Sequence, residues 1–238
     1  MMRGITRKLS RGALASVLVL AGAGFLIGAG QAMPAQACSL TSHCYGIAAW
    51  YSAPPDNGSG GDIYFNCLYS GDPSSDFTNE ELWQGTDNST GLDYWVELGG
   101  SYGWPNGATR YWFWADNRPN GGGYHAHYPG GTLSLDTSYF VGATWAGSDR
   151  WDVQGPSWSA VSSSNPYSGR AMETGAEITN NTAHAVGNIQ SLYYLNTAGD
   201  LYSGWSGASI QSHSSIISSL SWVGSGNSEL TWSTGSCS

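Results

Sequence analysis

Residues 172–178 read Met-Glu-Thr-Gly-Ala-Glu-Ile, and larger apolar side chains alternate with polar or small ones along this stretch. Successive side chains of a β-strand point to opposite faces of a sheet. Met172, Ala176 and Ile178 would then share one face. The two acidic residues, Glu173 and Glu177, would share the other. The stretch therefore predicts a strand with one face for the core and one face that carries carboxylates.

Similar short alternating segments recur along the chain, and clusters of Gly, Asn, Asp and Pro separate them. No apolar stripe with a helical period is long enough to predict a helix. About 200 residues suit one sandwich or barrel, and no linker divides residues 38–238. We therefore predict an all-β fold, a single antiparallel β-sandwich domain over residues 38–238. The expected strands are Asp62–Tyr69, Glu81–Thr86, Leu92–Leu98, Thr109–Asp116, Ser138–Trp145, Glu173–Ile178, Leu192–Leu195 and Ser214–Val223.

Residues 1–37 have the pattern of a secretory signal peptide. Four cationic residues precede an apolar run at 13–30, and Ala-Gln-Ala at 35–37 is a small-x-small cleavage site. A lipid-modified Cys38 is the alternative, but Ala35 stands where lipid-attachment signals prefer leucine. We expect a secreted, extracellular protein with no membrane attachment after cleavage.

The charge balance after cleavage argues against nucleic acid as a partner. Four arginines and no lysine would face 17 carboxylates, a formal charge of −13 (4 − 17). Phosphate binding needs clustered Lys and Arg. A strongly acidic chain repels itself less when its carboxylates protonate, which suits an acidic habitat, although solubility alone explains the composition equally well. We expect a monomer that does not bind nucleic acid.

All four cysteines lie in the exported part, which implies two disulfides in an oxidising compartment. Three connectivities are possible. We expect Cys38 to pair with Cys44, which leaves Cys67 to pair with Cys237. No C-x-x-C spacing for a metal or redox site occurs.

One further pattern bears on metal binding. His125 and His127 share one strand face, a geometry that zinc sites use, but no third ligand accompanies them. We therefore expect neither a metal nor another cofactor.

Two other predicted strands carry tryptophan and carboxylate on one face. Trp95 and Glu97 alternate with the apolar residues of 92–98, and Trp112, Trp114 and Asp116 alternate with the aromatic residues of 111–116. Large exposed aromatic surface marks binding sites, and burial beside indoles raises the pKa of a carboxyl group. Two such carboxyls can divide their roles, one protonated and one ionised, and activate water against an amide or a glycoside.

Three segments at this point resemble the glutamic peptidases called eqolisins. Trp83-Gln84-Gly85-Thr86-Asp87 resembles their Trp-x-Gly-x-Asp segment. Tyr111-x-x-Trp114-x-Asp116-x-x-Pro119 is similar to their Tyr-x-x-Trp-x-Glu-x-x-Pro segment. The stretch 173–178 resembles the segment that holds their catalytic glutamate, which falls on Glu177. The three segments occur in the family's order.

The resemblance implies a concanavalin-like jelly-roll sandwich with a cleft on a concave face. The family's catalytic glutamine falls on Glu97, so this chain offers a Glu–Glu pair, similar to the pair of the neprosin-type peptidases. Ile178-Thr179 replaces the family's Trp-Ile pair. If the pair is catalytic, Glu177 would act as general base and Glu97 as acid. Trp114 would wall the cleft, and Asp87 or Asp116 would orient the pair.

Three functions remain open from the sequence. The first is a secreted acid endopeptidase that acts on polypeptides. The second is a non-catalytic carbohydrate-binding sandwich in which Trp95, Trp112 and Trp114 stack on the sugar rings of a polysaccharide. The third is a glycan-cleaving enzyme that uses the same carboxylates. Catalysis requires Glu97 and Glu177 to face one cleft, whereas carboxylates on opposite faces would favour the binding protein.

Overall fold

The long strand β1 (Cys44–Tyr69) bends between two antiparallel sheets and takes part in both. The computed structural model describes residue 38 and residues 43–86, 94–119, 122–162, 169–212, 216–217 and 219–234. Residues 44–51 of β1 pair with β9 and residues 56–69 pair with β10. Pro54 and Pro55 lie between these two paired stretches, where a missing backbone N–H costs no ladder hydrogen bond.

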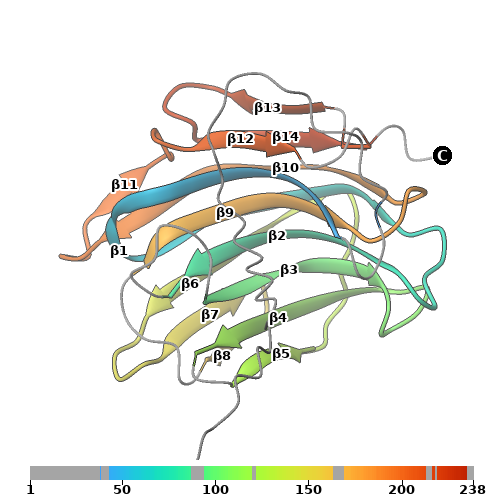
Figure 1. The fold of residues 1–238 in the computed structure, drawn as a ribbon, viewed down its shortest axis with the longest axis horizontal. Helices are drawn as coiled ribbons and strands as arrows, with labels where there is room; N and C mark the ends of the chain where they lie inside the picture. The colour runs from blue at the N-terminus through green and yellow to red at the C-terminus, as the bar shows by residue number, and fades with distance from the viewer. Residues whose placement is uncertain are drawn as a thin grey trace, which may run out of the picture. The chain divides into compact units, whose positions relative to one another are not determined.

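The first sheet is formed by the N-terminal half of β1 and six other strands (Figure 1). Their order is β12 (Ser209–Ser212), β1, β9 (Gly169–Ile178), β2 (Phe77–Gly85), β3 (Trp95–Gly103), β4 (Arg110–Arg118) and β5 (Gly123–His127).

The second sheet contains the C-terminal half of β1. Its order is β8 (Trp158–Val161), β7 (Trp151–Gly155), β6 (Thr137–Trp145), β1, β10 (His184–Asn196), β14 (Glu229–Ser233) and β13 (Ser219–Val223), and β11 (Leu201–Ser203) pairs with β10.

Aromatic and aliphatic side chains from both sheets fill the space between them. Trp112 of the first sheet makes edge-to-face contacts with Phe65 and Tyr139 of the second, at ring-centroid distances of 5.6 and 5.0 Å. Leu82 and Leu98 are also fully buried in this core. One face of the first sheet therefore covers the core, and its opposite face is free to form a site.

The predicted fold class is confirmed. Each of the eight expected segments overlaps an observed strand, and within the described ranges no helix is long and apolar enough to span a membrane. Cys38 and Cys44 form a disulfide, as expected, so the sulfur of Cys38 is not available for a lipid. Cys67 is also disulfide-bonded, while Cys237 lies outside the described residues.

Candidate active site

Strand β2 brings the two predicted catalytic glutamates together. It lies between β9 and β3, and the register sets Asn79 opposite Glu177 of β9 and Trp83 opposite Glu97 of β3. Because Asn79 and Trp83 are separated by four residues, their side chains lie on the same face of β2. The two glutamates therefore point from neighbouring positions of the first sheet into the space on its outer face.

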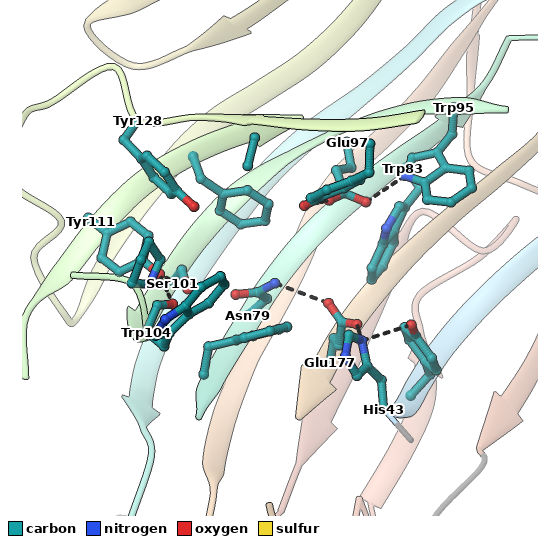
Figure 2. Close-up of a pocket in the computed structure, with 16 residues that line it drawn as sticks. His43, Asn79, Trp83, Trp95, Glu97, Ser101, Trp104, Tyr111, Tyr128 and Glu177 are labelled. Atoms are coloured by element: carbon teal, nitrogen blue, oxygen red, sulfur yellow. Dashed lines mark hydrogen bonds and ion pairs between the residues drawn. The ribbon is translucent and has the colours of Figure 1, made fainter. Parts of the chain in front are cut away.

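That space is a cleft of about 730 Å³ with both glutamates in its wall (Figure 2). Most of the other residues around it are aromatic, and the carboxylates lie toward one end, with Tyr111, Tyr128 and Trp104 toward the other. The lining residues are His43, Tyr45, Phe77, Asn79, Trp83, Trp95, Glu97, Ser101, Trp104, Pro105, Tyr111, Phe113, Tyr124, Ala126, Tyr128 and Glu177.

Glu97 is held by two hydrogen bonds, one to each carboxyl oxygen. The indole N–H of Trp95 donates to Oε2 at 2.6 Å, and the hydroxyl of Tyr124 donates to Oε1 at 2.6 Å. Burial raises the pKa of Glu97 to about 7, and the charge of Glu177 contributes further, against the lowering effect of these hydrogen bonds. Glu97 is therefore protonated under acidic conditions and can donate a proton there.

Glu177 has a different set of partners. Its Oε1 lies 2.5 Å from Nδ1 of His43, and its Oε2 accepts a hydrogen bond from the side-chain amide of Asn79 at 3.1 Å. These two contacts hold the carboxyl group of Glu177 in place at both oxygens. The two glutamates thus have different partners, an arrangement in which two carboxyl groups can divide the roles of acid and base.

A third carboxyl group, Glu81, lies under the cleft. Its side chain is on the same face of β2 as Asn79 and is fully buried. Burial raises the pKa of Glu81 well above its ordinary value, and the charges of Glu97 and Glu177 raise it further. Asn79 and Glu177 are close enough to influence this pKa, although neither carboxyl oxygen of Glu81 has a hydrogen-bond partner of good geometry among the described residues.

A glycine of the neighbouring strand β3 makes room for Glu81. Glu81 pairs with Gly99 of β3 and Gly175 of β9. A Cβ atom at position 99 would lie 2.6 Å from the Cβ of Glu81 and 2.2 Å from the carbonyl oxygen of Glu80. The close approach of β2 and β3 at this point therefore requires glycine at position 99.

The predicted binding residues lie in different parts of the structure. Trp95 lines the cleft next to Glu97, whereas Trp112 and Trp114 are buried with 1% and 6% exposure and pack in the core. Asp116 is fully buried, lies outside the cleft and pairs with Arg118 Nε at 2.8 Å. Asp87 lies outside the described residues.

The placement of Trp112, Trp114 and Asp116 corrects the face expected for β4. Tyr111 and Phe113, expected on the core side, line the cleft instead. Both faces of this strand are aromatic because one covers the core and the other walls the cleft, so alternation alone did not distinguish them.

The two histidines of β5 also lie outside the cleft lining. His127 stacks on Trp114 at a centroid distance of 4.0 Å, and His125 Nε2 contacts the carbonyl oxygen of Gly122 at 2.7 Å. In the part of the chain that the structure describes, no three His, Cys, Asp or Glu side chains are grouped as they would be around a metal ion.

Among the polar residues of the site, His43, Asn79 and Glu81 were not identified from the sequence. Glu81 and Asn79 could have been found, because they extend the alternation of Trp83 by two and four residues toward the N-terminus. His43 carries no such signal, since it is 134 residues from Glu177.

Comparison with solved structures identifies the same fold in glutamic peptidases. A Scytalido-glutamic peptidase bound to a peptide-based transition-state analogue shares 15% sequence identity and a TM-score of 0.58, with 84% of this chain and 99% of that chain covered. SCP-B, a member of the eqolisin family in complex with the tripeptide Ala-Ile-His, shares 15% identity and a TM-score of 0.52 over the same fractions. No family model matches the chain, and no curated protein matches its sequence. At this identity the likeness establishes the fold.

Proposed function

We propose that this protein is a secreted acid endopeptidase that hydrolyses peptide bonds with Glu177 as general base and Glu97 as general acid. The observation that carries the proposal is that both carboxyls line one cleft and interact, since the charge of Glu177 helps to raise the pKa of Glu97 to about 7. Two of the solved structures with this fold are peptidases bound to a peptide-based transition-state analogue and to a tripeptide, which supports a polypeptide substrate.

The proposed reaction begins with water held beside Glu177. Ionised Glu177 takes a proton from the water, and the water oxygen forms a bond to the carbonyl carbon of the peptide. The carbonyl oxygen gains the electron pair of its π bond and takes the proton of Glu97. The C–N bond then breaks as Glu177 returns its proton to the leaving nitrogen, and Glu97 recovers its proton as the carbonyl of the acid product re-forms.

The residues around the pair support these two roles. Trp95 and Tyr124 fix the orientation of Glu97 through both of its oxygens, which aligns its proton with the cleft. Asn79 fixes Glu177 through Oε2. The aromatic wall lowers the local water content and strengthens electrostatic interactions with the developing oxyanion.

Carbohydrate binding receives less support from the same geometry. Two of the three tryptophans that would stack on sugar rings, Trp112 and Trp114, are buried in the core. A glycan-cleaving enzyme would need the same pair of carboxylates. The experiment described next therefore distinguishes carbohydrate binding and glycan cleavage from peptide hydrolysis.

The test is digestion of a denatured protein by the mature chain, residues 38–238, across a pH series, with mass spectrometry of the fragments. We expect internal cleavage that is strongest at acidic pH and absent in Glu177→Gln. The matched control is Glu173→Gln, because Glu173 lies on the same strand face but outside the cleft and accepts a hydrogen bond from Tyr51. Intact protein at every pH would contradict the proposal, and release of sugars from a polysaccharide panel would favour the glycan-cleaving alternative.

A further inference from the structure

Among the described residues of the cleft wall, His43 is the one that can carry a positive charge. None of the four arginines in the described part of the chain lines the cleft. The ring of His43 is 30% exposed, and its Nδ1 lies 2.5 Å from Glu177 Oε1. A cation at this distance stabilises a carboxylate, and more so where little water reaches the pair.

The start of β1 fixes the position of this ring. Cys44 pairs with Ile178 and Tyr45 pairs with Glu177 in the β1–β9 ladder. His43 and Tyr45 are two residues apart, and both side chains line the cleft. The hydroxyl of Tyr45 lies 3.4 Å from His43 Nδ1, and the edge of the Phe77 ring packs against the imidazole at a centroid distance of 5.4 Å.

A disulfide also anchors the start of β1. Cys44, the next residue after His43, is bonded to Cys38, and the backbone N–H of Cys38 donates to the side-chain carbonyl of Asn181 at 3.0 Å. Asn181 follows the end of β9, the strand that carries Glu177. The disulfide and Glu177 are therefore attached to the same part of the sheet.

The other described groups that face Glu177 do not supply a positive charge. Tyr45 and Asn79 are neutral polar groups. Glu81 and Glu97 have raised pKa values for the reasons given above, so they are protonated under acidic conditions and remain neutral beside Glu177. His43 is therefore the described group beside Glu177 that could supply a positive charge.

We propose that His43 is a positioning residue for Glu177, whose protonated ring keeps that carboxyl ionised and oriented in acidic solution. The inference rests on the proposed peptidase function and deepens it. A base that must be ionised while its partner acid is protonated works only within a window of pH. His43 extends this window to more acidic conditions, because the imidazolium makes protonation of Glu177 less favourable.

The first experiment is the pH profile of kcat/KM for wild type and His43→Gln on one peptide substrate. We expect His43→Gln to lose about tenfold or more at the acidic end of the profile, the effect of removing one close opposite charge. The two profiles should approach each other at higher pH. His43→Lys restores a cation and should recover most of the lost rate, while the matched control His125→Gln should leave the profile unchanged. An equal loss at every pH, or no loss, would overturn the inference and leave the peptidase proposal intact.

The second experiment does not depend on activity. Proton NMR follows the ring of His43 through a pH titration in wild type and in Glu177→Gln. We expect the ring to lose its proton at a lower pH in Glu177→Gln, because the carboxylate that stabilises the imidazolium is absent. An identical titration in both proteins would show that the pair does not form in solution, whether or not any peptide is cleaved.

Discussion

Replacement of Glu97 by Gln tests the assignment of the acid most directly. With a pKa of about 7, Glu97 is half protonated near neutrality, and above that point the wild-type rate should fall about tenfold per pH unit. An amide has no proton to lose, so the rate of Glu97→Gln should stay level over the same range. The amide can still donate to an oxyanion, so the loss at acidic pH should be smaller than the roughly 10²–10³-fold loss seen when such a donor is removed.

The site can accept this substitution. The side-chain oxygen of Gln can take the hydrogen bond from Trp95, and its NH₂ group can donate to the hydroxyl of Tyr124, which can also act as an acceptor. The comparison variant is Glu97→Met, which keeps the length of the side chain and removes the donor. It should lose the full factor at acidic pH, where Glu97 of the wild type is protonated, and the loss should shrink above neutrality as the wild type loses its own donor.

The assay is initial peptide cleavage rate against pH, with circular dichroism at each pH to separate lost protonation from unfolding. A Glu97→Gln enzyme whose rate still falls tenfold per unit above neutrality would show that another group sets the alkaline limit. A folded Glu97→Gln protein without any activity would reverse the assignment of acid and base.

Three further predictions concern Glu177, two buried carboxyl groups and Gly99. Glu177→Gln should lower kcat by roughly 100-fold or more at all pH values, with binding of a peptide inhibitor largely retained in calorimetry. The free energy of unfolding should fall as the pH rises, because burial raises the pKa of Asp56 from 3.8 to about 8 and that of Glu173 from 4.5 to about 7. Below the pKa values of the unfolded chain, the contribution of these two groups to stability is fully present. It is lost as the pH rises through their pKa values in the folded state. A urea midpoint that increases with pH would contradict this. Gly99→Ala should destabilise the fold by about 1–3 kcal/mol in urea denaturation, since the new methyl group would contact Glu80 and Glu81, and unchanged stability would show that β2 and β3 can separate at this point.

Part of the site was predictable because alternation on β9 is unambiguous. Met172 and Ile178 are apolar and Glu173 and Glu177 are charged, so the two faces of that strand have different physical requirements. The glutamate of β3 was placed on the correct side for the same reason. Where both faces of a strand are buried, as around Trp112, the alternation carries no information about which face covers the core.

Other parts depend on contacts that no local pattern records. The first half of β1 contains Gly46, Ala48 and Ala49, small residues with little strand preference, and it is a strand because β9 and β12 pair with it on both sides. His43 contacts Glu177 because the pairing of β1 with β9 places the start of β1 beside the end of β9. The contacts of such a residue can be inferred only when the pairing of the strands is known.

The passage of β1 through both sheets has a consequence for the way the molecule unfolds. Residues 44–51 exchange hydrogen bonds with β9 and β12, and residues 56–69 with β6 and β10. If β1 detached, both layers would lose their hydrogen-bonded neighbour in one event, so neither layer can melt while the other keeps a complete ladder. Amide hydrogen exchange should therefore give one shared opening free energy for the centre of both sheets, and a protease should find no intermediate with a single intact layer.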